Sequence, residues 1–443
     1  MNKREFLAMG GALPLMLAGC GGSGTGSAPM RLVNASVGYP LLGFMDQSTP
    51  ATTADVAYGA TSPYVGVEAG AVGLTLTVGG ASATAAQIRT VSKDSRYSLV
   101  AYGFPNELKS VLITESTIVP DAGQANVNVL NTSVDIGAVD VYLSATTDLS
   151  VSTLIASSVA GVQQSAFAGV IAGSYYVTVV GANSIALGVK DQRFQTPAPI
   201  VLTALQVLTI ILTPGASGVL ANAIMLTQGT TGTAVSYLNT TARLRAITST
   251  GGLSASVAGV LTSNTTPQYS NYVVVTTGAP PVVTVNGGTV TPFMYVTNAT
   301  TGVVTSQPAA LAAGGDYTLM VYVDGTGAAT AQLIEDNNTA PVIAQGVKFR
   351  LVNLAYNNQG LQLSMSVNSI SVASLVPYAA ASTYTEIPVP QQTTSVAEVF
   401  NGTEAVTQHT QVMLLGNIFT DFVVSVDPTT GAAKDIFRAA SGT

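Results

Sequence analysis

Short runs of alternating hydrophobic and polar residues fill most of this 443-residue chain. Valine, threonine, isoleucine and tyrosine dominate the runs, which are separated by glycine or by pairs such as Asn286-Gly287, Asp324-Gly325 and Asn401-Gly402. A period of two belongs to strands, in which successive side chains point to opposite faces, and such pairs favour hairpin turns. No amphipathic helical pattern of any length interrupts the strands, so the pattern predicts an all-β chain.

Two strand patterns recur four times. Each copy of the first has a polar side chain at every second place, which predicts a first strand buried on one face only. Its copies are Met30–Ala35, Ala125–Asn131, Ala242–Ile247 and Val347–Asn353. A second marker strand follows at Tyr97–Tyr102, Leu208–Leu212, Tyr317–Tyr322 and Phe422–Val426. The spacing predicts a tandem array of four Ig-like β-sandwiches of about 100 residues, at 30–120, 125–230, 242–338 and 347–440.

The N-terminus has the pattern of an export leader. Lys3 and Arg4 provide positive charge, and the apolar stretch that follows is too short to span a bilayer. The stretch closes on Leu17-Ala18-Gly19-Cys20, and Cys20 is the single cysteine, so no disulfide forms within the chain. These residues resemble the lipobox of bacterial lipoproteins.

The lipobox resemblance implies a lipid anchor. It implies a signal peptide at residues 1–19, which the peptidase recognises at Leu17, Ala18 and Gly19, and acylation of Cys20. Two or three acyl chains hold a protein to a membrane far more firmly than one. Residues 20–29 are then a flexible Gly/Ser tether.

The leader also bears on export and sorting. Lys3, Arg4, Phe6 and Leu7 resemble a twin-arginine signal with lysine in place of the first arginine, which leaves the Sec and twin-arginine routes both open. Gly21 stands where an aspartate would mark inner-membrane retention in many lipoproteins. The expected location is therefore the cell envelope, at the outer membrane.

The composition narrows the classes of partner that can be expected. Charged residues make up 8% of the chain, and the net charge is −7, whereas an average soluble protein has about 25% charged residues. Lysine and arginine are not clustered, so no nucleic-acid partner is expected. The most apolar later segment, Pro199–Leu212, is too short and too rich in threonine for a membrane helix, and suits buried strands better.

Three further segments carry a family resemblance. Val139–Leu143, Ala172–Val179 and Leu333–Pro341 resemble the domain-of-unknown-function 4397 family. The resemblance implies a bacterial exported protein, often a lipoprotein, built from tandem Ig-like sandwiches, and it implies no established activity. The third unit departs most from the family, because Leu253–Val257 lacks the Asp-Val-Tyr pattern.

Candidate chemistry is sparse, so the sequence predicts no catalytic residue, no cofactor and no metal site. His409 is the only histidine, and its neighbours resemble neither a nucleophile elbow nor a zinc motif. One histidine and an acylated cysteine cannot assemble a metal site of imidazoles or thiolates. Glu335 and Asp336 are adjacent acids in a run of Asn, Thr and Pro, which is typical of a solvated connector. A calcium loop there is the alternative, although the EF-hand spacing is missing.

Tyrosine, with 17 residues, is the commonest aromatic. Tyr97, Tyr175 and Tyr317 each follow turn residues at the start of a strand, which resembles the tyrosine corner of Ig-like sandwiches, where the hydroxyl bonds to nearby backbone. Stacking on sugars is the other use of such side chains.

These patterns predict a lipid-anchored envelope protein with a structural, adhesive or protein-interaction role and no catalysis. Its partners would be the membrane, through Cys20, and an envelope or surface protein or glycan. One alternative is a glycan- or peptidoglycan-binding module, with exposed Tyr and Asn side chains clustered on one sheet face. A less favoured alternative is a carboxylate-dependent hydrolase, which needs two acids from different segments in one pocket.

Overall fold

The computed structural model describes residues 26–48, 52–185, 191–229, 233–249, 253, 255–257, 260–261, 269–278, 282–285, 288–297, 304–343, 345–389, 394–413 and 417–439. The predicted signal peptide and Cys20 lie outside these residues. The described chain consists of strands and one short 3₁₀ turn, η1 (Leu149–Val151). Within it, no helix is long and apolar enough to cross a membrane.

Within the described residues the strands form eight sheets, which pair into four sandwiches in chain order. This confirms the predicted all-β tandem array. The apolar segment at residues 199–212 forms strands, as expected.

In the first sandwich, β1 (Ser27–Asn34), β4 (Val65–Glu68), β8 (Tyr97–Tyr102) and β9 (Lys109–Thr114) form one sheet. The other sheet holds β2 (Leu41–Asp46), β3 (Val56–Ala57), β5 (Gly70–Val78), β6 (Ala81–Ser82) and β7 (Gln87–Val91). Alternate apolar side chains of the two sheets meet in a core that includes Leu32, Phe44 and Leu99.

The second sandwich repeats this plan. One sheet contains β10 (Gln124–Asn131), β13 (Gln163–Gln164), β14 (Ala168–Ile171), β18 (Val207–Pro214), β19 (Ala221–Thr227) and β20 (Ala234–Tyr237). Its partner sheet contains β11 (Val139–Ser144), β12 (Thr153–Val159), β15 (Gly173–Gly181), β16 (Gln192–Gln195) and β17 (Ile200–Leu202).

The third sandwich differs most from the others. Its larger sheet contains β21 (Thr241–Thr248), β24 (Val273–Thr276), β27 (Phe293–Thr297), β28 (Val304–Pro308), β29 (Asp316–Val323) and β30 (Ala329–Asp336). The described strands of its smaller sheet are β22 (Ala255–Val257), β23 (Val260–Leu261), β25 (Val283–Val285) and β26 (Gly288–Val290). Here β27 joins the edge of β30 in parallel, and β28 extends the sheet beyond it.

The fourth sandwich returns to the common plan. One sheet contains β31 (Gly346–Asn353), β34 (Ala380–Ala381), β35 (Thr385–Pro388), β38 (Ile418–Val426) and β39 (Ala433–Ala439). The other contains β32 (Leu363–Val367), β33 (Ile370–Val376), β36 (Thr394–Asn401) and β37 (Glu404–Val412).

Each sandwich pairs its first strand in parallel with its marker strand. The register is Met30 opposite Tyr97 in the first sandwich, and Val127 opposite Leu208 in the second. It is Leu244 opposite Tyr317 in the third, and Phe349 opposite Phe419 in the fourth. This shared register aligns the four repeats residue by residue.

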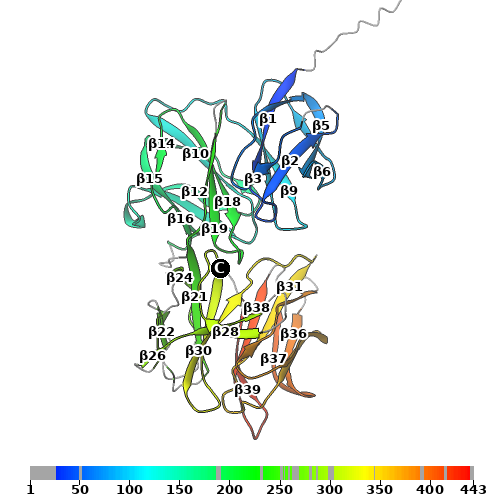
Figure 1. The fold of residues 1–443 in the computed structure, drawn as a ribbon, viewed down its shortest axis with the longest axis vertical. Helices are drawn as coiled ribbons and strands as arrows, with labels where there is room; N and C mark the ends of the chain where they lie inside the picture. The colour runs from blue at the N-terminus through cyan, green and yellow to red at the C-terminus, as the bar shows by residue number, and fades with distance from the viewer. Residues whose placement is uncertain are drawn as a thin grey trace, which may run out of the picture.

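The sandwiches pack sheet to sheet as two pairs (Figure 1). Between the first and second, the outer faces of β1 and β8 meet β10, β18 and β19 in an apolar cluster that includes Val33, Val100 and Ile211. Between the third and fourth, Met320, Val352 and Phe422 belong to a corresponding cluster. The four sandwiches therefore form two side-by-side pairs rather than a single row.

This packing overturns the expectation that each first strand is buried on one face only. Every residue of β31 is buried, and β1, β10 and β21 are buried over most of their length. One face of each strand packs in its own core and the other packs against the neighbouring sandwich. The alternating polar side chains therefore lie in the joints between sandwiches.

Candidate functional site

The predicted leader residues Lys3, Arg4, Phe6, Leu7, Leu17, Ala18, Gly19 and Cys20 all lie outside the described residues. Among the described residues, buried charged and polar side chains are concentrated in the joints between sandwiches and in one cluster of the fourth sandwich.

The joint between the first and second sandwiches is built around Arg31 on β1. Its side chain is fully buried and lies 2.9 Å from a carboxylate oxygen of Glu115. Its Nε donates to Ser98 Oγ at 2.8 Å, and its terminal nitrogen donates to the carbonyl of Thr227 in the second sandwich at 2.9 Å. Glu115 in turn accepts from the backbone N–H of Gly229 in that sandwich at 3.0 Å. The ion pair therefore bridges both sandwiches.

Asp336 is the centre of the joint between the third and fourth sandwiches. It is the last residue of β30, is fully buried, and pairs with Arg245 of the third sandwich and Arg350 of the fourth. The Thr318 and Tyr272 hydroxyls also donate to it. Burial alone would raise the pKa of Asp336, but the two guanidinium groups and these hydrogen bonds outweigh it and lower the pKa.

The expectation of a solvated connector at Glu335 and Asp336 is therefore wrong, because both residues belong to β30. Glu335 is exposed, but β30 continues through Asp336, whose side chain points into the joint. Alternation along the strand places the neighbouring acids on opposite faces. A calcium loop would need these oxygens free, whereas those of Asp336 are already paired.

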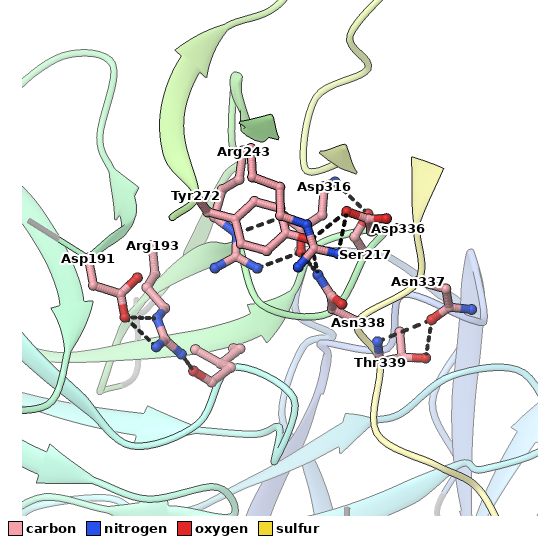
Figure 2. A network of polar contacts seen from close by, with 12 residues as sticks. Asp191, Arg193, Ser217, Arg243, Tyr272, Asp316, Asp336, Asn337, Asn338 and Thr339 are labelled. Carbon is pink, nitrogen blue, oxygen red and sulfur yellow. Dashed lines mark hydrogen bonds and ion pairs between the residues drawn. The ribbon is translucent and has the colours of Figure 1, made fainter. Parts of the chain in front are cut away.

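Figure 2 shows the polar network where the second sandwich meets the third sandwich and the connector that leads to the fourth. Arg243 forms two parallel hydrogen bonds to Asp316, at 2.7 and 2.6 Å. Asn338, in the connector to the fourth sandwich, donates to Asp316 at 2.7 Å, and the backbone N–H of Asp316 donates to Ser217 of the second sandwich at 2.8 Å. Both carboxylate oxygens of this buried acid already accept hydrogen bonds, so Asp316 is poorly placed to act as a general acid or base.

The three predicted tyrosine corners are confirmed. The Tyr97 hydroxyl accepts from the N–H of Ser92 at 2.9 Å, and that of Tyr317 accepts from Ala312 at 3.0 Å. The Tyr175 hydroxyl donates to the carbonyl of Ile171 at 3.0 Å. Among all described tyrosines, the exposed ones are Tyr295 and Tyr356, which belong to different sandwiches.

Two shallow grooves lie at equivalent places in the second and fourth sandwiches. One, of about 300 Å³, is lined by residues 155–159 and 163–167, and the other, of about 370 Å³, by residues 371–377 and 381–383. Both form where the chain leaves one sheet for the other. Their lining is mostly serine, alanine, valine and glutamine or threonine, with no charged side chain among the lining residues. They offer shape and weak polarity but no reactive group.

The sequence did not connect His409 with any other residue, but the structure brings it to two acids. His409 Nε2 on β37 lies 2.6 Å from Asp435 Oδ2 on β39 and 3.7 Å from Asp421 Oδ2 on β38. Burial, and then the neighbouring charge of Asp435, raises the pKa of Asp421 well above its ordinary value. The three residues lie on different strands with no motif spacing, so only the sandwich topology unites them.

Comparison with known protein families matches the first part of the chain. Residues 28–142, which span the first sandwich and the start of the second, match a family described as Domain of unknown function (DUF4397). This is the family that the sequence motifs resemble, and one of those motifs, Val139–Leu143, overlaps the end of the matched residues. No match was found among curated proteins.

Proposed function

We propose that this protein is a lipid-anchored scaffold of the bacterial cell envelope, with a structural or interaction role and no catalysis. The anchor is the acylated Cys20, and the site of action is the outer membrane. The sandwiches hold a surface for contact with envelope or surface macromolecules at a fixed distance from the lipid.

The proposal rests on one observation: although the chain has few charged residues, several of them are buried in the joints between sandwiches and hold the sandwiches together. Arg31, Arg245 and Arg350 all lie in joints, and each is fully or almost fully buried. Arginine is seldom buried unless it is paired, and a buried pair requires precise geometry to offset its desolvation. Joints of this kind favour a rigid body, which suits a scaffold better than a set of independently moving modules.

The buried acids in the joints give little support to a carboxylate-dependent hydrolase. Asp316 and Asp336 are both enclosed and bound by arginine. A glycosidase needs one carboxyl group to protonate the leaving group and another to attack or to activate water, and neither role suits an acid with that environment.

The anchor is tested by feeding cells an alkyne fatty acid and measuring its incorporation into the full chain. We expect labelling of the wild type, loss in Cys20→Ala, and unchanged labelling in Ser23→Ala, a matched substitution in the tether. Equal labelling of Cys20→Ala and the wild type would contradict the anchor.

The interaction role is tested in the same strains by proximity labelling from the C-terminus. We expect a set of labelled envelope macromolecules in the wild type and in Ser23→Ala that is lost in Cys20→Ala. Identical sets in all three strains would show that the anchor does not determine the neighbours, and an empty wild-type set would refute the interaction role.

A further inference from the structure

The fourth sandwich brings three potential metal ligands together across its two sheets. His409 lies on β37, at the edge of one sheet, while Asp421 on β38 and Asp435 on edge strand β39 belong to the other. One ligand-capable atom from each lies within 4.8 Å of the others. The cluster therefore spans the open side of the sandwich, which is the side formed by edge strands β37 and β39. Among the described residues, β37 pairs with β36 and β39 pairs with β38, so no backbone pairing joins the two sheets there.

Asp421 is unusual within this cluster. Its side chain is 0% exposed, and neither carboxylate oxygen accepts a hydrogen bond from a described donor. Buried polar groups are almost always satisfied, and an exception calls for a specific cause such as a bound ion. The side chain points at His409 and Asp435, which are 25% and 12% exposed. A solvent path therefore reaches the cluster from the side of these two residues.

We propose that His409, Asp421 and Asp435 bind a divalent cation of the zinc class. One imidazole nitrogen with two carboxylate oxygens suits zinc, whereas calcium and magnesium prefer oxygen ligands throughout. Zinc bonds of about 2.0–2.2 Å in a tetrahedron place neighbouring ligand atoms roughly 3.3 Å apart. His409 Nε2 lies 2.6 Å from Asp435 Oδ2 and 3.7 Å from Asp421 Oδ2, one distance below that value and one above it. Small side-chain shifts would therefore bring these two distances to the value that zinc requires. Solvent would complete the coordination.

Aromatic packing holds the imidazole in place. The His409 ring stacks on Phe437 with centroids 4.5 Å apart and planes 8° from parallel, and Phe437 stacks in turn on Phe419 at 5.0 Å. A ligand whose rotamer is fixed by packing loses less freedom on binding. The cation would then clamp β37 to β38 and β39, which closes the open side of the sandwich.

The first test titrates the chelator-treated full chain, in detergent and without a polyhistidine tag, with zinc chloride in a calorimeter. We expect one zinc bound per chain with micromolar affinity or tighter. His409→Gln and Asp435→Asn should each weaken binding by at least about tenfold. Thr410→Ala, at the exposed neighbour of His409, should leave it unchanged. If the wild type binds no more zinc than His409→Gln, the site does not exist.

Thermal unfolding provides a second readout that does not depend on calorimetric heats. A cation that binds only the folded state stabilises it by mass action, so zinc should raise the Tm of the wild type and Thr410→Ala by several degrees, reversibly with chelator. The two ligand variants should show no such shift while retaining the far-ultraviolet circular dichroism of the wild type. A shift of equal size in Asp435→Asn would overturn the assignment. The inference does not rest on the lipid anchor, so neither result bears on Cys20.

Discussion

At the scale of single residues, one position of the repeat decides the chemistry of each joint. The shared register aligns Arg31, Asn128, Arg245 and Arg350 in the four first strands. It also aligns Glu115 with Asp336, because each lies one residue beyond the strand position that pairs with the marker tyrosine, Tyr97 or Tyr317. The first pair of sandwiches thus combines one arginine with one carboxylate, and the second pair combines two arginines with one carboxylate.

Aromatic rings offset the additional positive charge in the second pair. The Arg245 guanidinium lies 4.6 Å from the centre of the Tyr272 ring and 5.4 Å from that of Phe422, and Arg350 lies 4.5 Å from that of Tyr384. The faces of these rings attract cations, most strongly where water is excluded. Asp336 nevertheless supplies the formal negative charge that both guanidinium groups share.

Asp336→Asn should therefore destabilise the protein strongly. The change leaves two buried guanidinium groups without their shared counterion, and removal of one partner from a buried pair costs about 3–5 kcal/mol of unfolding free energy. Glu335→Gln is the matched control, because Glu335 is the exposed neighbour on the same strand, and its effect should stay within about 0.5 kcal/mol. Urea unfolding measures both values. Equal effects of the two substitutions would show that the joint does not depend on Asp336.

The lowered pKa of Asp336 predicts that the destabilisation caused by Asp336→Asn depends on pH. The folded state lowers the pKa of Asp336 below its ordinary value of 3.8, so its contribution to stability is complete above that ordinary pKa. The contribution is lost as the pH falls through the lower, folded-state pKa. The gap between wild type and Asp336→Asn should therefore be widest at about pH 7 and narrower at about pH 3. A gap that stays constant would contradict this assignment.

At the scale of elements, a buried asparagine ends three of the four first strands. Asn353 donates to the carbonyls of Leu361 and Val376, at 3.0 and 2.9 Å, and accepts from the N–H of Ala355 at 3.1 Å. Asn34 and Asn131 form the same three kinds of bond in their sandwiches. One side chain thus satisfies the backbone of two loops where a first strand stops. In the third sandwich Thr248 takes this place in the register.

Asn353→Ala should weaken the fourth sandwich by about 2–4 kcal/mol, because each buried backbone group left without a partner costs about 1–3 kcal/mol. Chemical denaturation of the full chain, monitored by hydrogen exchange in β31 and β32, measures the loss and locates it. Asn271→Ala, at an exposed asparagine of the third sandwich, is the control and should change little. Unchanged protection of β31 in Asn353→Ala would refute this role for the side chain.

The period of two in the sequence was enough to predict the strands, the four repeats and the tyrosine corners, since all of these are local or recur at fixed spacing. It could not show that Arg245 and Arg350 face a neighbouring sandwich, because alternation looks the same whether the second face meets water or protein. The buried position of Asp336 leaves no trace in the sequence either, because its chain neighbours Asn337 and Asn338 have the composition of a loop. His409, Asp421 and Asp435 are joined only by the pairing of separate strands, which leaves no spacing to recognise.

At the scale of the whole molecule, the two pairs form one connected body. Ser217 accepts from the backbone of Asp316, and Asp135 accepts from the backbone N–H of Ala340 in the connector before the fourth sandwich. These contacts tie the second sandwich to the third and to that connector. Figure 1 shows the first pair above the second, with β1 starting at the upper end and β37 and β39 near the lower end. A tether before β1 would thus leave the fourth sandwich at the far end of the body.

This arrangement predicts that a charge in a joint will separate a pair without unfolding its members. Met320 on β29 is fully buried in the joint, whereas its neighbour Leu319 packs in the core of the third sandwich. Burial of an unpaired lysine in Met320→Lys would cost several kcal/mol, so we expect the third and fourth sandwiches to come apart while their cores persist. Small-angle X-ray scattering should show a larger radius of gyration and maximum dimension, with the far-ultraviolet circular dichroism preserved. Val282→Lys, at a valine that is 72% exposed in the same sandwich, should scatter like the wild type. A compact Met320→Lys protein would mean that the polar contacts around Asp336 hold the pair together even when the apolar joint is disrupted.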